Sequence, residues 1–285
     1  TFTTAPTVNA GTDITTCQDI ASIALNGSVT IATGGTWTTS GSGTFNPNAT
    51  TLTASYIPSA TDTAAGNVTL TLTTTGNGLC NAYSDEVLIT LTDIPTVNAN
   101  VDQTICADAT GAFLAGSVTI ATGGTWATSG TGTFSPNNSV LGATYIPSDA
   151  DTTAGTVTLT LTTTGNGLCQ SYSDQMTVTI SPAPIANANV DQTVCADITS
   201  VPLNGSVINA TGGAWTTAGT GTFSPDNLTL NASYVASTAD TIAGSVTLTL
   251  TTTGNGTCNA YTDDVLITFT TAPTVNAGTD ITTCQ

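Results

Sequence analysis

The sequence predicts an all-β protein made of tandem β-sandwich domains that follow one another as an extended rod. The first observation is an eleven-residue run, Val-Thr-Leu-Thr-Leu-Thr-Thr-Thr-Gly-Asn-Gly, which occurs unchanged from Val68, from Val157 and from Val246. The second observation is that these starts lie 89 residues apart, with no insertion or deletion between them. Such a period is too long for one coil of a solenoid and matches one small β-sandwich.

The unchanged run predicts the first strand of a long β-hairpin. Its Val and Leu residues alternate with Thr, which places apolar side chains on one face of the strand and hydroxyls on the other. Val and Thr are β-branched and favour an extended backbone. Gly-Asn-Gly then supplies residues that tolerate a positive φ, and a second alternating run follows with Val87, Ile89 and Leu91. The hairpin therefore recurs in every repeat.

The other elements of the first repeat are short runs separated by Gly, Pro, Asn and Ser. In chain order we expect a short edge strand at 13–17, a strand at 22–29, two strands joined by Ser-Gly pairs within 34–45, a strand at 52–57, a loop at 59–66 and the long hairpin. About seven short strands with turns between them fit an immunoglobulin-like sandwich.

The domain boundaries follow from landmarks that keep the same step, among them a Pro at the start of each repeat. We place the end of a preceding repeat at 1–5, three repeats at 6–94, 95–183 and 184–272, and the start of another at 273–285. Residues 268–285 repeat residues 1–18 letter for letter, so we expect the chain to be a window on a longer polymer. Short linkers that contain Pro restrict swivelling and favour a stiff rod.

The composition excludes several classes of function. The chain has no Lys, Arg or His and 18 acidic residues, for a net charge of −18. This field repels nucleic acid and anionic lipid, whose phosphates need cationic partners. Without a cationic side chain or a base that titrates near neutrality, an enzyme is not expected. No apolar run reaches the length of a membrane span.

The cysteines indicate disulfides in an oxidising, extracellular location. No His or Cys-x-x-Cys pair accompanies them, which argues against zinc. The seven positions are Cys17, Cys80, Cys106, Cys169, Cys195, Cys258 and Cys284.

Two pairing schemes remain open. Pairing inside each repeat gives Cys17–Cys80, Cys106–Cys169 and Cys195–Cys258. In an immunoglobulin topology, however, the two cysteines of one repeat fall at opposite ends of the sandwich, beyond the reach of a disulfide. Pairing between neighbouring repeats gives Cys17–Cys169 and Cys106–Cys258 and leaves Cys80, Cys195 and Cys284 for partners outside the sequence.

Five sequence blocks carry a resemblance to a known family. They are Val-Asn-Ala-Gly-Thr-Asp, Leu-Asn-Gly-Ser-Val, Ala-Thr-Gly-Gly-Thr-Trp, Gly-Thr-Phe-Ser-Pro-Asn and the eleven-residue run. Together they resemble the repeats of giant surface adhesins of gliding Bacteroidetes, the SprB type, and more loosely PKD-like and other immunoglobulin-like repeats. The resemblance implies export by type IX secretion, a cell-surface filament, contact with the motility machinery, and attachment to external surfaces or polysaccharide through other regions.

We therefore expect a structural and adhesive stalk whose neighbours are repeats of the same chain. The alternative is an array of modules that bind carbohydrate or protein, which would show divergent loops or clustered exposed aromatics. Trp37, Trp126 and Trp215 fall on a predicted central strand, so we assign them to the cores and not to sugar stacking.

Two further sites are predicted from the acidic residues. If neighbouring repeats meet at the cysteines, Asp19, Asp62 and Asp174 would converge at one junction and Asp108, Asp151 and Asp263 at the next, where Ca²⁺ would relieve their repulsion. The alternative is a solvated acidic surface. The Asp-Thr pairs also resemble the O-glycan acceptors of Bacteroidetes, which implies modification of Thr63, Thr152 and Thr241 in the loop at 59–66 and its equivalents. Asp-Thr also commonly caps a turn.

Overall fold

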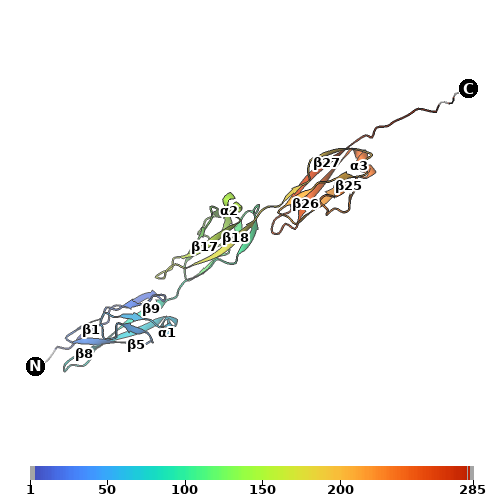
Figure 1. Ribbon diagram of the computed structural model, residues 1–285. Coiled ribbons are helices and arrows are strands. Elements are labelled where there is room, and N and C mark those ends of the chain that lie inside the picture. The colour runs from blue at the N-terminus through green and yellow to red at the C-terminus, as the bar shows by residue number, and fades with distance from the viewer. Residues whose placement is uncertain (1–3, 281, 283–285) are drawn as a thin grey trace.

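The computed structural model describes residues 4–280 and 282, and it places the three repeats one after another in a line (Figure 1). Within the described part of the chain, every sheet is formed by strands of a single repeat. Each repeat contains a four-stranded, a three-stranded and a two-stranded sheet together with one short helix. The predicted all-β architecture of tandem immunoglobulin-like sandwiches is confirmed.

The first repeat shows the arrangement that the other two copy. Its four-stranded sheet has the order β2 (Ile14–Cys17), β9 (Ser84–Thr92), β8 (Asn67–Thr75), β5 (Gly34–Thr39). Its three-stranded sheet has the order β3 (Ile23–Ala24), β7 (Ser55–Ile57), β6 (Thr44–Asn46). The remaining elements are the pair β1 (Thr7–Asn9) and β4 (Ser28–Thr30) and the helix α1 (Ala60–Ala65).

The second and third repeats contain the same elements. In the second they are β11 (Gln103–Cys106), β18 (Ser173–Ser181), β17 (Thr156–Thr164), β14 (Gly123–Thr128); β12 (Ala112–Phe113), β16 (Thr144–Ile146), β15 (Thr133–Ser135); β10 (Thr96–Asn98), β13 (Ser117–Thr119); and α2 (Asp149–Ala154). In the third they are β20 (Gln192–Cys195), β27 (Thr262–Thr270), β26 (Ser245–Thr253), β23 (Gly212–Thr217); β21 (Val201–Pro202), β25 (Ser233–Val235), β24 (Thr222–Ser224); β19 (Ile185–Asn187), β22 (Ser206–Ile208); and α3 (Thr238–Ala243).

The core of each sandwich is packed around the single tryptophan. Trp37 is 1% exposed and packs with Tyr56, Leu70 and Leu72, which are fully buried. The indole Nε1 of Trp37 donates a hydrogen bond of 3.1 Å to the carbonyl of Leu52. Trp126 and Trp215 hold the same position. The alternating Val and Leu residues of the long hairpin and the tryptophan of β5 therefore line the same four-stranded sheet, and Ile23 and Tyr56 of the three-stranded sheet supply the opposite wall.

The segment at 22–29 differs from its prediction as one strand. It forms β3 in the three-stranded sheet and then β4 beside β1, and the chain changes sheets at Gly27. A Cβ at Gly27 would collide with the Trp37 ring and the Leu72 side chain, so the backbone passes close over the core there. Likewise β5 and β6 belong to different sheets, and the strand expected at 52–57 is limited to β7.

The segment at 59–66 is a helix and not the expected loop. Ser59 is the N-cap, its hydroxyl accepts from the amide of Asp62, and the Asp62 carboxylate accepts from the amide of Ser59. Gly66 ends the helix at φ 75°. Ser-x-x-Asp acts here like the Ser-x-x-Glu capping box, and glycine is the usual residue after a helix. These signals were present in the sequence, but six residues are too few to show a helical period.

Candidate functional site at the domain junctions

The parallel pairing of β2 with β9 brings the first cysteine of each repeat to the far end of its domain. Cys17 lies opposite Thr92, the last residue of β9 and the first residue of the linker. The amide of Gln18 donates a hydrogen bond of 3.0 Å to the carbonyl of Thr92, which continues the pairing of the two strands past the cysteine. Cys17 is 2% exposed. The sulfur is therefore held at the base of the linker, where the following domain begins.

The loop of the long hairpin approaches the same place from the following domain. It joins β17 to β18 and carries Cys169, whose amide donates to the carbonyl of Asn166 at 3.1 Å. Gly165 and Gly167 have φ of 68° and 62°. A Cβ at Gly165 would collide with the side chain of Thr122, so only glycine fits this turn. The unchanged Gly-Asn-Gly thus aims a cysteine at the preceding domain.

Disulfides connect neighbouring domains at both junctions. Cys17 is bonded to Cys169 and Cys106 to Cys258, each pair with a Cα–Cα distance of 4.9 Å. This is the pairing between neighbouring repeats, and it replaces the alternative pairing within a repeat. The Sγ of Cys169 lies 3.3 Å from the carbonyl oxygen of Asp93, so the bridge packs on the linker.

The remaining cysteines lie outside these two bridges. Cys80 occupies the hairpin loop of the first repeat, and its Sγ lies 3.8 Å from the carbonyl oxygen of Thr4. Cys195 ends β20, is partly buried and has no disulfide within the described residues. Cys284 lies outside the residues that the structure describes.

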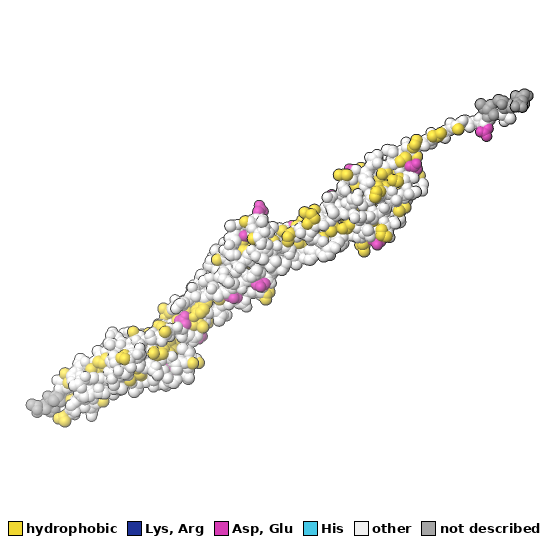
Figure 2. All heavy atoms as spheres, viewed as in Figure 1, with side chains coloured by type: hydrophobic (Ala, Val, Ile, Leu, Met, Phe, Trp, Pro, Cys, Tyr) yellow, Lys and Arg dark blue, Asp and Glu magenta, His cyan; other side chains and the backbone are white. Residues whose placement is uncertain are grey.

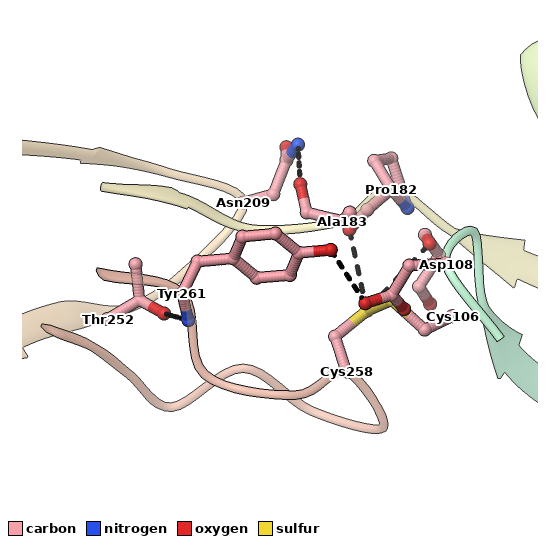
Figure 3. Close-up of a disulfide and its surroundings, with 9 residues drawn as sticks. Cys106, Asp108, Pro182, Ala183, Asn209, Thr252, Cys258 and Tyr261 are labelled. Carbon is pink, nitrogen blue, oxygen red and sulfur yellow. Dashed lines mark hydrogen bonds between the residues drawn. A yellow bond between two sulfur atoms is a disulfide. The ribbon is translucent and has the colours of Figure 1, made fainter. Parts of the chain in front are cut away.

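A tyrosine and an aspartate form a second connection beside each disulfide. The hydroxyl of Tyr172 donates to the carboxylate of Asp19 at 2.8 Å, and Tyr261 donates to Asp108 at 2.8 Å. Figure 3 shows Tyr261 reaching past the Cys106–Cys258 bridge to Asp108. No motif in the sequence predicts this role for the tyrosines. The available signal was their spacing, because each lies three residues after the cysteine of its loop.

The second junction has a further contact of its own. The side-chain amide of Asn209 donates 3.0 Å to the carbonyl of Ala183 in the linker (Figure 3). Asn209 has φ of 56°, and the equivalent positions hold Ile31 and Ile120 at φ of 66° and 65°. Asparagine tolerates this backbone conformation better than a β-branched residue. Asn209 therefore adds a hydrogen bond between domains without the backbone strain of isoleucine.

We predict that the junction tyrosines ionise at a higher pH than an ordinary tyrosine. Their hydrogen bonds to Asp19 and Asp108, together with partial burial of the hydroxyl and the nearby negative charge, raise the pKa of Tyr172 and of Tyr261. Asp19→Asn should lower the ionisation midpoint of Tyr172, followed by NMR of its ring carbons. The exposed and distant Glu86→Gln is the matched control, and an equal shift in both variants would contradict the assignment.

The predicted calcium triads are not assembled among the described residues. Of the first triad, Asp19 accepts from Tyr172, Asp62 is buried inside its own domain, and Asp174 accepts from the amide of Ala99 at 2.8 Å. Asp108, Asp151 and Asp263 have the equivalent partners at the next junction. Each carboxylate is bound by a separate donor, and the three carboxylates of a triad do not gather at one point among the described residues.

The described residues contain one group with the spacing of a metal site. It consists of Cys106, Asp108 and Cys258, whose ligand atoms lie within 4.8 Å of one another. Both sulfurs belong to the disulfide and so offer no thiolate to a metal. The disulfide of the junction therefore accounts for the short distances within this group.

The aspartate of each short helix is a buried structural carboxylate. Asp62 is 2% exposed and accepts from the hydroxyl of Tyr56 at 2.8 Å and from the amides of Ser59 and Ser42 at 2.9 and 3.0 Å. Asp151 and Asp240 repeat these contacts. Burial by itself raises the pKa of such a carboxyl, but the hydrogen bonds outweigh it and hold the pKa of all three at about 2.

These lowered pKa values predict how stability depends on pH. A carboxyl with a pKa lowered from 3.8 to about 2 binds fewer protons in the folded than in the unfolded state. The stability that it contributes, roughly 2 kcal/mol per repeat, is complete above the unfolded value and lost as the pH falls through the folded value. We expect the free energy of unfolding to stay level down to about pH 4 and to fall between pH 4 and 2. Denaturant titrations should show a shallower acid slope for a variant with Asn at all three positions; an unchanged slope would contradict the prediction.

The threonines predicted to carry glycans lie in these helices and not at loop tips. Thr63 is partly exposed, and its hydroxyl donates to the carbonyl of Ala60 at 2.9 Å. Thr241 makes the same contact with Thr238 at 3.0 Å, and Thr152 is also partly exposed. The aspartate beside each threonine caps the helix, which accounts for the Asp-Thr pair by itself.

Comparisons with known proteins support the fold. No family model matches the chain, and no curated protein sequence matches it. The I-band fragment I67-I69 from titin covers 94% of this chain and 100% of its own, at 13% identity and a TM-score of 0.51. Mouse cadherin-23 EC22-24 covers 94% of this chain and 99% of its own, at 12% identity and a TM-score of 0.39. At this identity the likeness to titin shows the fold alone, a row of immunoglobulin-like domains.

The described part of the chain contains no helix with the length and apolar character that crossing a membrane requires. Figure 2 shows acidic side chains scattered over the visible face and not gathered into one patch. The contacts that join one repeat to the next, a disulfide and a tyrosine–aspartate hydrogen bond, lie at the junctions and are separate from the sandwich cores.

Proposed function

We propose that the chain is a stalk segment of an extracellular adhesive filament, in which the repeats hold other parts of the protein away from the cell. The observation that carries the proposal is the pair of interdomain disulfides, Cys17–Cys169 and Cys106–Cys258. A bridge beside a short linker fixes the angle between two domains, which a spacer needs and an isolated binding domain does not. Disulfides of this kind also favour an oxidising, extracellular location.

The finer proposal follows from the resemblance to adhesins of gliding Bacteroidetes. It is a filament exported by type IX secretion, moved by the cell-surface motility machinery and attached to surfaces or polysaccharide through regions beyond these repeats. The net charge of −18 and the absence of cationic side chains support a soluble, protease-resistant rod, because trypsin-like cleavage needs Lys or Arg.

The test is to change the number of repeats in the source organism. Removing one unit of 267 residues, the distance between residues 1 and 268 at which the sequence recurs, should bring a tip epitope closer to the cell by the length of three domains. Immunogold labelling of the tip and of the repeats measures this distance. A tip that stays at the same distance would contradict the spacer function.

Glycosylation of Thr63, Thr152 and Thr241 stays a prediction within this proposal. A row of glycans along the rod would limit lateral association of the Thr-rich sheets. Intact mass and glycopeptide fragmentation of filaments from the source organism are expected to show modified Thr at these positions. Thr153, the next residue of the same helix and one that does not follow an aspartate, is the site for comparison. Unmodified Thr63, Thr152 and Thr241 would end the prediction.

A further inference from the structure

We propose that the first repeat carries a cleft that binds a neutral saccharide, and that the equivalent space is closed in the second and third repeats. The cleft has a volume of about 570 Å³, within the range of small-ligand sites. It lies on the flank of the domain where the edge strand β2 of one sheet meets the edge strand β3 of the other. Its lining residues are Asn9, Ala10, Gly11, Thr12, Ile14, Ala24, Asn26 and Ser28. The proposal does not depend on the spacer function.

The second and third repeats close the equivalent space with a glutamine. Where the first repeat has Ile14, they have Gln103 and Gln192. The side-chain amide of Gln103 donates 2.8 Å to the carbonyl of Phe113, and that of Gln192 donates 3.1 Å to the carbonyl of Pro202. These bonds tie the two edge strands together. Isoleucine has no donor, so the two edges of the first repeat are not linked in this way.

Other lining positions are also smaller or more polar in the first repeat. Ala24 is replaced by Phe113 and Pro202, and Gly11, with φ of 96°, is replaced by asparagine at 100 and 189. Thr12 is replaced by valine, at 101 and 190, which is 71% and 74% exposed. The first repeat thus presents a hydroxyl where the others present an exposed apolar side chain.

The chemistry of the lining selects a neutral partner rich in hydroxyls. Within the described residues, the side chains of Thr12, Asn26 and Ser28 are exposed and make no hydrogen bond to the protein. Asn9 accepts from the amide of Gly11 at 2.7 Å, which leaves its side-chain amide as a donor. No charged side chain lines the cleft, so it offers no anchor to an anion or a cation. Ala24 and Ile14 add the aliphatic surface that the C–H faces of a sugar require.

The sequence also predicts how often the cleft recurs. Residues 268–285 match residues 1–18 letter for letter, whereas the starts of the second and third repeats differ at the positions that open the cleft. At the lining positions that differ, Gly278, Thr279 and Ile281 therefore restore Gly11, Thr12 and Ile14. A cleft in every third domain would space weak binding sites regularly along the rod.

The experiment follows amide chemical shifts of the full chain during titration with three neutral disaccharides, maltose, cellobiose and chitobiose. At least one is expected to shift Asn9–Thr12 and Asn26–Ser28 without shifting the equivalent residues of the other repeats. Glucuronate serves as the anionic probe and trialanine as the peptide probe. No shift with any disaccharide, equal shifts in all three repeats, or a response to trialanine alone would overturn the proposal.

Two variants copied from the chain itself make the test specific. Ile14→Gln installs the closing glutamine of the second repeat and is expected to weaken binding by at least about tenfold. Gln103→Ile, Phe113→Ala, Asn100→Gly and Val101→Thr together should open a second site at the equivalent residues. Both variants introduce residues that the chain already has at the equivalent positions of another repeat. Thermal unfolding verifies that they fold. Unchanged binding in the closing variant would overturn the assignment of the cleft.

Discussion

Replacing Cys17, Cys106, Cys169 and Cys258 by serine is expected to turn the stiff rod into three domains that swivel about their linkers. Each bridge connects residues 152 apart in sequence, and a loop of that length corresponds to about 5 kcal/mol in the chain-entropy model. Small-angle scattering should show a shorter and broader distribution of maximum dimensions, and thermal unfolding should occur at a lower temperature. The domains themselves should remain folded, because no bridge lies inside a sandwich.

The control for this variant is Cys195→Ser, which lies outside both bridges. It removes a thiol without breaking an interdomain connection, so scattering and unfolding should match the wild-type chain. After loss of the bridges, the hydrogen bonds of Tyr172 to Asp19 and of Tyr261 to Asp108 remain across the junctions, together with that of Asn209 to Ala183 at the second. Scattering curves that are identical for the four-serine variant and the wild type would show that the bridges do not set the shape.

Replacing Asp151 by alanine is expected to destabilise the middle repeat by about 3–5 kcal/mol. The carboxylate accepts from the hydroxyl of Tyr145 at 2.7 Å and from the amides of Ser148, Thr131 and Gly132 at 3.0, 2.9 and 2.8 Å. Removing it leaves these donors without their acceptor in a place where little water enters, which costs more than the loss of a single exposed hydrogen bond.

The matched control for Asp151→Ala is Thr152→Ala at the next residue of the same helix. Thr152 is partly exposed, and its loss should change stability little. Asp151→Asn should fall between the two, because an amide has one acceptor oxygen where the carboxylate has two. Denaturant unfolding followed by the fluorescence of Trp126, with Trp37 and Trp215 replaced by Phe, reports on this repeat alone. Equal effects of the alanine variants at 151 and 152 would refute the role of the buried carboxylate.

Much of the fold was open to prediction from the sequence. The alternation of Val and Leu with Thr decides which face of the hairpin is buried, because a strand has a side-chain period of two. The tryptophan in each repeat is too large and apolar to remain outside a core of this size. The period of 89 residues defines the domain size because every repeat must bury its own core.

Other parts of the site were not decided by residue spacing. A cysteine at 17 is compatible with Cys80 and with Cys169, since every repeat carries the same pattern. An aspartate in a Thr-rich segment is equally compatible with a surface, a metal site or a buried cap, and the Ser59-x-x-Asp62 signal is too short to distinguish them. The tyrosine that reaches Asp19 lies 153 residues away in sequence, beyond any local pattern.

The sequence by itself determined the repeat, the sandwich class, the buried face of the hairpin and the acidic character of the surface, because each depends on local periodicity or on composition. The tertiary structure alone decided which cysteines meet, that Asp62 serves the core and not a junction, and that Ile14 leaves open a cleft which Gln103 closes. The physical reason is that these outcomes depend on which ends and edges of the sheets face each other. That arrangement is fixed by the parallel pairing of β2 with β9 and by the crossing at Gly27, which bring together residues that are distant in the chain.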